Sequence, residues 1–471
     1  MKRFWLVLLS LGLIIAFSTS AFAVDVKVSG EYYVAGLYLD RTTLNKDRLM
    51  TKAAVAEVPG TPEKSYQDYR AAIPAQYQEA GLSTAFFYQR LRVRTDFVVS
   101  PGLTLVTRFD AMERVWGGQR SAPGTTSASD SAGTRAENEN IAFDWAYIDY
   151  VSPLGTFAVG LMEDGRTGTV FGNSYTTLGR IKWKNTFGPV TLAADITKSK
   201  DQSNSYASTA TYTDADNDKY GLEGVYAWKD GKAGMKVTYY NYSEKSPGAS
   251  PDGNYKKKYF LFTPYTIAKI GPVDLQAELN YATGNLKEYG DSTGYVSLQN
   301  ISGWIDATAN LDMAYVGGTI AYVSGDDPNT KDKQEGGTLN GGQDWNPCLI
   351  LFNYYDRTYW VGALNGNGSS ANSGPMTNAW FFQGRAGVKP IADLDIMASL
   401  SYASADKKPK DFVGGSYGWE ADVTGTYKIT NNLSYMLGVG YLFTGDYFKG
   451  TASANAVSDN YMLINKLTLT F

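Results

Sequence analysis

The 471-residue chain contains no histidine and a single cysteine, Cys348. Without histidine, neither a Ser-His-Asp triad nor a His-ligated metal site can form. One cysteine cannot form an internal disulfide, and no Cys-x-x-Cys pair is present to hold zinc or attach haem. These absences weigh against an enzyme and against a cofactor, and we expect neither.

Long apolar runs are missing from most of the chain. No stretch after Val24 has the roughly 18 consecutive apolar residues of a spanning helix. The net charge is −4, and would be −6 without Lys2 and Arg3, so no nucleic-acid partner is expected. Aromatic residues are abundant, with 35 Tyr, 20 Phe and 10 Trp. A membrane β-barrel fits both features, because its strands alternate apolar with polar residues and aromatic belts mark its two interfaces.

The N-terminal segment has the three parts of a secretory signal peptide. A basic start precedes an apolar stretch over residues 4–17, and small residues around Ala23 mark a cleavage site. A retained anchor is the less favoured alternative, because the apolar stretch is short. We expect residues 1–23 to be removed, leaving 24–471 as a single barrel domain exported to the outer membrane.

Alternation with a period of two is clearest between Ile141 and Lys184. In three short runs, apolar side chains alternate with charged, polar or small ones. The apolar positions are Ile141, Phe143, Trp145, Tyr147, Phe157, Val159, Leu161, Ile181 and Trp183. A soluble sheet would bury this face in a core, whereas a transmembrane barrel turns it to lipid and the other face to a water-filled lumen.

Eight short breaker sequences recur at a spacing of about 40 residues, with one doubled gap. They centre on residues 101, 154, 188, 230, 271, 311, 391 and 431. Longer segments rich in Gly, Ser, Asn and Asp separate the strands at their other ends. This asymmetry predicts an all-β, up-and-down antiparallel barrel of about 18 strands, with short periplasmic turns and long extracellular loops. Sixteen strands are the alternative if the weak runs over 303–310 and 313–322 are not strands.

Two large insertions cover residues 41–81 and 324–377. The first contains a short run that could form a helical turn or two above the barrel. The second carries the aromatic residues Trp345, Tyr354, Tyr355, Tyr359 and Trp360. It is either a loop hairpin that folds over the mouth of the barrel or an aromatic platform for sugar rings. Cys348, in the same insertion, is typical of a buried small residue.

Two segments resemble the general diffusion porins of Gram-negative outer membranes. Residues 146–160, AYIDYVSPLGTFAVG, are similar to the strand, turn and strand that precede the inward-folded third loop of those porins. Residues 465–471, NKLTLTF, resemble their terminal strand, which ends in Phe. Leu161 and Met162 depart from the Arg-Gln that usually follows the second strand.

The resemblance implies passive diffusion of small hydrophilic solutes, often through a homotrimer embedded in outer-membrane lipid. It implies a constriction loop over residues 164–177, with Glu163 and Asp164 as the matching acidic residues. It also implies that the terminal strand is the signal for insertion into the outer membrane, carried by Leu467, Leu469 and Phe471.

Basic residues at alternating positions predict a charged wall of the lumen. They are Arg90, Arg92, Arg94, Arg108, Arg114, Arg180, Lys182 and Lys184. An acidic loop facing this wall would set up a transverse field that favours polar solutes, and we expect a weak anion preference. The alternative is a ladder neutralised by Asp96 and Asp110 that only solvates the wall.

The sequence therefore predicts a porin for passive diffusion of ions and small hydrophilic solutes. One alternative is a channel specific for a substrate such as a sugar or an organic anion. Another is a barrel that sheathes a partner, such as an electron-conduit cytochrome.

Overall fold

A computed structural model describes residues 24–45, 83–117, 141–201, 216–244, 255–289, 295–337 and 342–471. The expected signal peptide and most of the insertion over residues 41–81 lie outside the described residues. Within the described ranges, no helix has the length and apolarity needed to cross a membrane.

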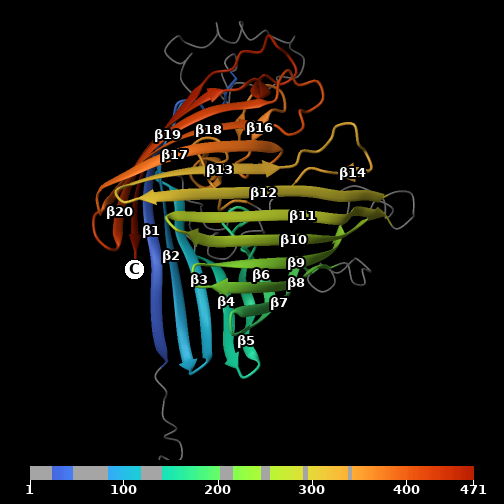
Figure 1. Ribbon diagram of the computed structural model, residues 1–471, viewed down its shortest axis with the longest axis vertical. Coiled ribbons are helices and arrows are strands. Elements are labelled where there is room, and N and C mark those ends of the chain that lie inside the picture. Colours follow the sequence, from blue (N-terminus) through green and yellow to red (C-terminus); the bar gives the residue numbers. More distant parts are fainter. Residues whose placement is uncertain are drawn as a thin grey trace, which may run out of the picture.

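Eighteen antiparallel strands close into a barrel in the described part of the chain (Figure 1). The strands of its first half are β1 (Asp25–Leu39), β2 (Thr84–Ser100), β3 (Leu103–Val115), β4 (Ile141–Ser152), β5 (Gly155–Asp164), β6 (Thr176–Phe187), β7 (Val190–Lys200), β8 (Asn217–Trp228) and β9 (Gly231–Glu244). Those of its second half are β10 (Tyr255–Ile270), β11 (Val273–Tyr289), β12 (Tyr295–Leu311), β13 (Ala314–Val323), β17 (Ala379–Ile391), β18 (Leu394–Ser404), β19 (Ser416–Lys428), β20 (Leu433–Thr444) and β21 (Asn460–Thr470).

Closure comes from the pairing of the last strand with the first. β21 pairs with β1 over Glu31–Leu39, and β1 pairs with β2 on its other side. The ring therefore has no free edge, as hydrocarbon requires. The prediction of 18 strands is confirmed, and the two weak runs belong to β12 and β13.

The remaining described elements are short. β14 (Lys333–Gln334) pairs in parallel with β12, and β15 (Leu364–Asn365) pairs with β16 (Ala371–Asn372). Three short helical elements are η3 (Tyr354–Thr358), α4 (Tyr359–Val361) and η4 (Asp446–Lys449).

All eight predicted breakers lie in short connections at one end of the barrel, which we call the turn end. Gly102, Gly188 and Gly271 adopt φ values of +80°, +59° and +59° there, a region that costs glycine little. The longer connections meet at the opposite end, the loop end. The expected asymmetry between the two ends is therefore confirmed.

The outer surface of the barrel is apolar, and the alternate side chains face inward. On β11, Leu279 is exposed on the outside, whereas Glu278 and Asn280 are buried inside. Exposed rings lie near both ends of the strands: Trp380, Trp419 and Phe443 near the loop end, and Phe187, Trp228 and Tyr427 near the turn end. An apolar band between two aromatic girdles is the surface that a bilayer stabilises.

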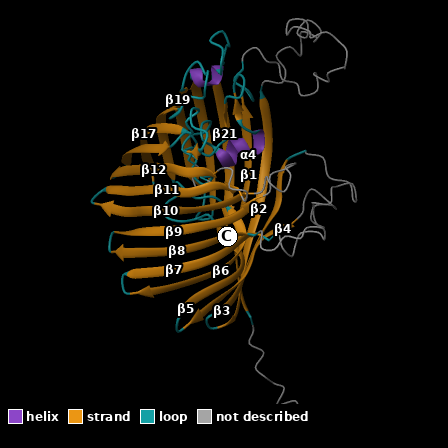
Figure 2. Ribbon diagram, turned by 90° about the vertical axis from the view of Figure 1, so that its right-hand side faces the viewer, coloured by secondary structure: helices purple, strands orange, loops and turns teal. Residues whose placement is uncertain are grey.

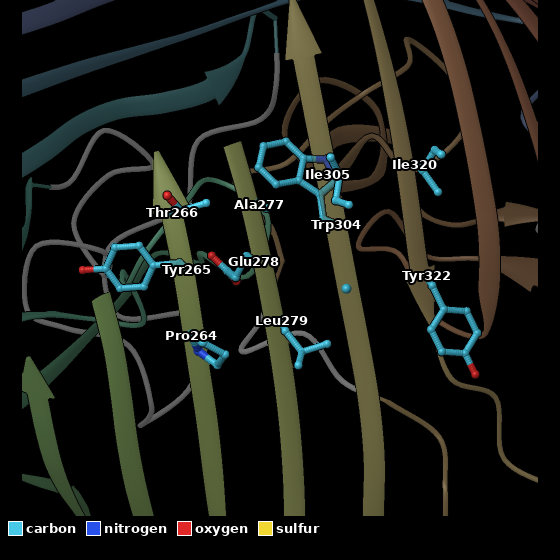
Figure 3. A pocket seen from close by; sticks show the side chains of 11 residues that line it. Pro264, Tyr265, Thr266, Ala277, Glu278, Leu279, Trp304, Ile305, Ile320 and Tyr322 are labelled. Atoms are coloured by element: carbon cyan, nitrogen blue, oxygen red, sulfur yellow. The ribbon is translucent and has the colours of Figure 1, made fainter. Parts of the chain in front are cut away.

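A shallow apolar hollow of about 500 Å³ lies on β10 to β13 (Figure 3). Its rim includes the exposed side chains of Leu279, Ile305 and Ile320, and Gly303 leaves space between them. This hollow belongs to the lipid-facing side of the wall and does not bound the lumen.

The expected faces of β4 are wrong for its middle. A β-bulge breaks the register between β3 and β4, because Arg108 lies opposite Trp145 and Phe109 opposite Phe143, leaving Asp144 between them. Phe143 therefore faces outward, but Trp145 and Tyr147 turn to the lumen, where they line polar cavities. Apolar and polar residues keep alternating in the sequence across the bulge, but the extra residue turns the apolar positions after it from the outer face to the lumen.

The connection between β13 and β17 enters the loop-end half of the barrel, and Figure 2 shows its helix α4 between the walls. We call residues 342–364 the inner segment. Its backbone N–H groups at Ile350 and Leu351 donate to the carboxylate of Glu420 on β19, at 2.6 and 2.7 Å. The segment therefore packs against the wall inside the barrel and does not merely cover its mouth.

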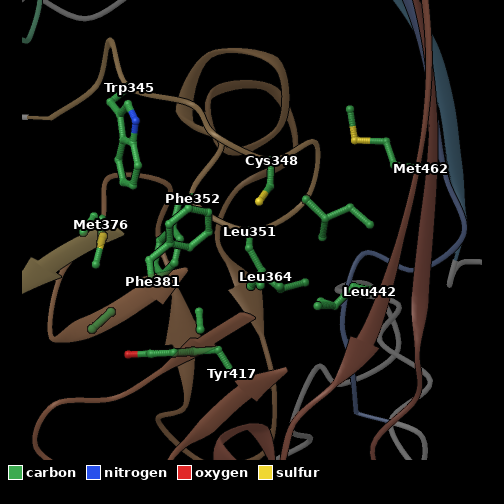
Figure 4. Close-up of a cluster of buried hydrophobic side chains, with 14 of the residues drawn as sticks. Trp345, Cys348, Leu351, Phe352, Leu364, Met376, Phe381, Tyr417, Leu442 and Met462 are labelled. Atoms are coloured by element: carbon green, nitrogen blue, oxygen red, sulfur yellow. The ribbon is translucent and has the colours of Figure 1, made fainter. Parts of the chain in front are cut away.

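Inward-facing apolar side chains of the wall surround this inner segment (Figure 4). Phe381 on β17, Leu442 on β20 and Met462 on β21 are fully buried against residues such as Leu351 and Phe352. Here the wall is apolar on both faces, because one face meets lipid and the other meets the chain's own core. The two polar cavities along β2 to β6 lie on the other side of this segment.

Candidate functional site

A second inward segment, the loop between β5 and β6, crosses the lumen. Thr169 donates to Glu278 on β11 through both its backbone N–H and its hydroxyl group, at 2.8 and 2.7 Å. The ring of Phe171 stacks on Trp304 of β12, with centroids 5.8 Å apart and planes within 6°. Because β11 and β12 are not neighbours of β5 or β6, these contacts place the loop across the barrel.

The crossing loop and the inner segment are joined to each other. Arg166 Nε lies 2.9 Å from an Asp344 oxygen, and Asp344 also accepts a hydrogen bond of 2.8 Å from the Tyr355 hydroxyl. Phe171 contacts Trp345 edge to face, with centroids 5.2 Å apart. Together the two segments form a partition opposite β2 to β4.

A polar cavity of about 850 Å³ lies between this partition and the wall. Its wall side carries Arg90, Arg92, Arg94 and Arg108. Its partition side carries Asp344, Tyr354, Tyr355, Asp356, Tyr359 and Trp360. We call this space the arginine cavity.

Three of these arginines are paired with carboxylates. Arg92 makes two hydrogen bonds of 2.6 Å to Asp110. Arg94 Nε lies 2.8 Å from Asp96, and Arg90 lies 3.1 Å from Glu31. The charges of these three arginines are therefore largely neutralised. Asp96 and Asp110 are the partners that the alternative interpretation of the sequence predicted.

Arg108 is held mainly by aromatic rings. Its guanidinium carbon lies 3.6 Å from the ring centroid of Trp145 and 4.6 Å from that of Tyr175. The nearest carboxylate, Asp144, is 3.5 Å away, and Arg108 Nη2 has no hydrogen-bond partner among the described residues. Stacking fixes the position of this charge, and Asp144 neutralises part of it.

A second polar cavity, of about 350 Å³, shares Arg94 and Trp145 with the first. It lies toward the turn end, and we call it the lysine cavity. Its charged lining residues are Arg94, Arg180, Lys182, Lys184, Asp149 and Glu163. Neither Lys182 nor Lys184 forms an ion pair with a residue that the structure describes. Arg94 and Arg180 instead pair with Asp96, Asp164 and Asp195, so Lys182 and Lys184 supply the positive charge that this cavity presents.

The two expected acidic residues do not lie together on the cavity surface. Glu163 lines the lysine cavity and pairs with Arg166 at 3.0 Å. Asp164 is buried at the end of β5, where it pairs with Arg180 at 3.5 Å and with Lys219. Asp164 thus belongs to a charge network within the wall.

The other expected residues are spread over the barrel. Arg180 bridges Asp164 and Asp195, the latter at 3.1 Å, and also borders the lysine cavity. Arg114, near the loop end of β3, lines neither cavity. On β21, Leu467 and Leu469 are exposed on the outer face, and Phe471 follows the strand.

The sequence did not single out several residues of the arginine cavity. Asp144, Trp145 and Tyr175 hold Arg108, and Lys466 pairs with Asp356 at 3.1 Å. The bulge in β4 hid Trp145, because strict alternation assigns it to the lipid face. Tyr175 and Asp356 lie on inward segments, whose path no strand periodicity reveals.

No family model matches this sequence, and no curated protein matches it. Solved structures of similar fold include OpdQ of Pseudomonas aeruginosa, 13% identical, with a TM-score of 0.47 over 96% of this chain and 100% of that chain. OpdK of Pseudomonas aeruginosa, solved with vanillate, is 11% identical, with a TM-score of 0.46 over 94% and 99% of the two chains. The outer membrane channel DcaP of Acinetobacter baumannii is 12% identical, with a TM-score of 0.40 over 95% and 97%. The likeness is one of fold.

Proposed function

We propose that this chain is an outer-membrane porin through which ions and small hydrophilic solutes diffuse passively, with a preference for anions. The observation that carries the proposal is the pair of adjoining polar cavities inside a closed barrel whose outer face is apolar. Solutes would pass the arginine cavity, then Arg94 and Trp145, then the lysine cavity. No chemical reaction is involved.

The anion preference is assigned to the lysine cavity. In the arginine cavity, Arg90, Arg92 and Arg94 each have a carboxylate partner, so their field is mostly transverse. In the lysine cavity, Lys182 and Lys184 have none among the described residues, so they attract anions. The proposed filter therefore lies toward the turn end of the barrel.

The orientation and assembly follow from the same proposal. The short turns would face the periplasm and the long loops the outside of the cell. Export would remove residues 1–23, and the outward-facing Leu467 and Leu469, with Phe471, would serve as the insertion signal. The barrel would assemble as a homotrimer in outer-membrane lipid.

Liposome swelling tests the proposal. Vesicles that contain the folded protein should swell in iso-osmotic solutions of small sugars and organic acids, at rates that fall as the solute grows. Vesicles prepared with heat-unfolded protein are the control. A folded protein that admits none of these solutes would contradict a diffusion role.

A substrate-specific channel is the second candidate. Tyr354, Tyr355 and Tyr359 face the arginine cavity, so rings and cations are available to one bound solute. A specific channel would show saturable block of ionic current by its solute, and Tyr355→Ala would weaken that block. A general porin would show none across a panel of sugars and organic acids.

A further inference from the structure

The single cysteine of the chain lies beside two buried carboxylates. Cys348 belongs to the inner segment, and Glu420 and Asp422 are alternate inward residues of β19. Only 3%, 0% and 4% of their respective surfaces are exposed. One potential ligand atom from each residue lies within 4.8 Å of the other two.

Hydrogen bonds within the described chain satisfy only part of this cluster, although the Leu349 backbone and the Ser399 hydroxyl group both lie close to the Asp422 carboxylate. The Asp422 Oδ1 atom is buried without a hydrogen-bond partner among the described residues. The same holds for the Oγ atom of Ser399, which pairs directly opposite Asp422 on β18 and is itself 7% exposed. Buried oxygen atoms left without partners cost free energy unless something binds them.

The charges of the cluster also lack a direct counter-charge. Arg357 is fully buried and interacts electrostatically with Glu420 at longer range, but it forms no ion pair with a described residue. Its Nη1 atom donates instead to the carbonyl oxygen of Gly362 at 2.9 Å. Two neighbouring buried carboxylates need either a shared proton or a bound cation.

We propose that Cys348, Glu420 and Asp422 form a binding site for a divalent transition-metal ion of the zinc class. A thiolate sulfur with carboxylate oxygens suits a borderline-soft ion such as Zn²⁺ and disfavours Mg²⁺ and Ca²⁺, which prefer oxygen alone. The hydroxyl group of Ser399 or a water molecule would complete a tetrahedral set. The N–H groups of Ile350 and Leu351 fix the Glu420 carboxylate, as outer partners of metal ligands commonly do.

Binding replaces the thiol proton. Burial raises the pKa of the Cys348 thiol, so the S–H bond stays intact without a nearby cation. When the ion binds, the S–H bond breaks and a metal–sulfur bond forms. The thiol proton leaves to solvent, together with the proton that the two carboxylates share in the metal-free chain. The ion would then tie the inner segment to β19. It would thereby hold in place the tyrosines that line the arginine cavity.

The experiment uses cobalt as a probe. Untagged full-length chain, folded into detergent micelles with either Co²⁺ or Zn²⁺ present, is dialysed and its bound metal is measured. Because the chain has one cysteine and no histidine, a thiolate-to-cobalt charge-transfer band can come only from Cys348. We expect about one equivalent of metal per chain and this band.

Variants locate the site. Cys348→Ser should lose the charge-transfer band, and Asp422→Asn should lose the bound equivalent, while both keep the heat-modifiable migration of a folded barrel. Glu278→Gln is the matched control, because Glu278 is a buried, backbone-bonded carboxylate with no thiol beside it, and it should bind metal as the parent does. A parent chain that folds with cobalt present but shows neither band nor bound metal would overturn the site. Unchanged binding in Asp422→Asn would also overturn it.

Discussion

At the scale of single residues, the lumen wall combines paired and unpaired cations. Arg92 and Asp110 form a two-bonded pair, whereas Lys182 and Lys184 have no carboxylate partner in the described chain. A charge that is paired with its opposite contributes little net electric field along the pore, whereas the field of an unpaired charge is not cancelled. The two kinds should therefore respond differently to neutralisation.

Neutralising the lysines should reduce anion selectivity. A charge about 8 Å from a passing ion in water contributes roughly 0.5 kcal/mol, or about a two-fold change in the permeability ratio. Lys182→Gln and Lys184→Gln should each lower the anion-to-cation ratio by about two-fold. Reversal potentials in a salt gradient measure this, with Lys389→Gln, on β17 and outside both cavities, as the control. Unchanged ratios in both variants would remove these lysines from the filter.

Replacing Arg92 should change ion selectivity because it leaves Asp110 without its partner. Arg92→Gln leaves the Asp110 carboxylate alone in the wall, so selectivity should shift toward cations and stability should fall by about 1 to 3 kcal/mol. Adding Asp110→Asn should restore the parental reversal potential, because the pair as a whole is neutral. A double variant with the same reversal potential as Arg92→Gln would show that the pair is not coupled.

Much of this wall could be read from alternation in the sequence, which identified the arginines of β2 and the basic residues of β6. Pairing could not be read in the same way, because a partner such as Glu31 lies 59 residues from Arg90 in the chain. The burial of Asp164 among Arg180 and Lys219 likewise depends on strands brought together by closure.

At the scale of elements, the strands and turns follow local rules and the inward segments do not. The breaker residues predicted the eight turns, and the alternation of apolar and polar residues predicted most strand faces. The bulge at Asp144 inserts one extra residue into β4, and this reverses the faces of the residues that follow it. The sequence did not predict the bulge, because an extra residue leaves no trace in composition. The inner segment is stabilised by contacts with β17 to β21, which are distant in sequence.

Gly160 on β5 provides a test of strand packing. Its φ is +138°, and a Cβ atom there would lie 2.5 Å from the carbonyl oxygen of Ala146. Gly160→Ala should therefore destabilise the β4–β5 pair by about 1 to 3 kcal/mol. The temperature at which the folded band disappears in gel electrophoresis should fall.

Gly179→Ala is the matched control for this prediction. Gly179 lies on the next strand, β6, and a Cβ atom there would meet nothing within 4 Å. The control should unfold at the parental temperature. If both alanine variants unfold at the same temperature as the parent, the close approach at Gly160 does not limit stability.

At the scale of the whole molecule, the chain narrows its own barrel. An 18-stranded ring is wide enough for an aqueous channel, but the inner segment fills the side next to β17 to β21. Conduction is therefore expected only along β2 to β6, through the two joined cavities. Strand count alone would overestimate the size of the pore.

Replacing residues 346–362 with a Gly-Ser linker of equal length should widen the pore. Single-channel conductance should rise roughly two-fold, because most of the barrel cross-section would then carry current. An equal replacement of 327–332, which lines neither cavity, should leave conductance unchanged. Equal conductance in both variants would mean that the inner segment does not restrict the flow.

The most direct measurement is the single-channel current of the purified, folded protein in a planar bilayer under a salt gradient. We expect ohmic steps, grouped in threes if the barrels form trimers, with a reversal potential on the anion side. A folded barrel that passes no current, or one that prefers cations, would contradict the proposed function.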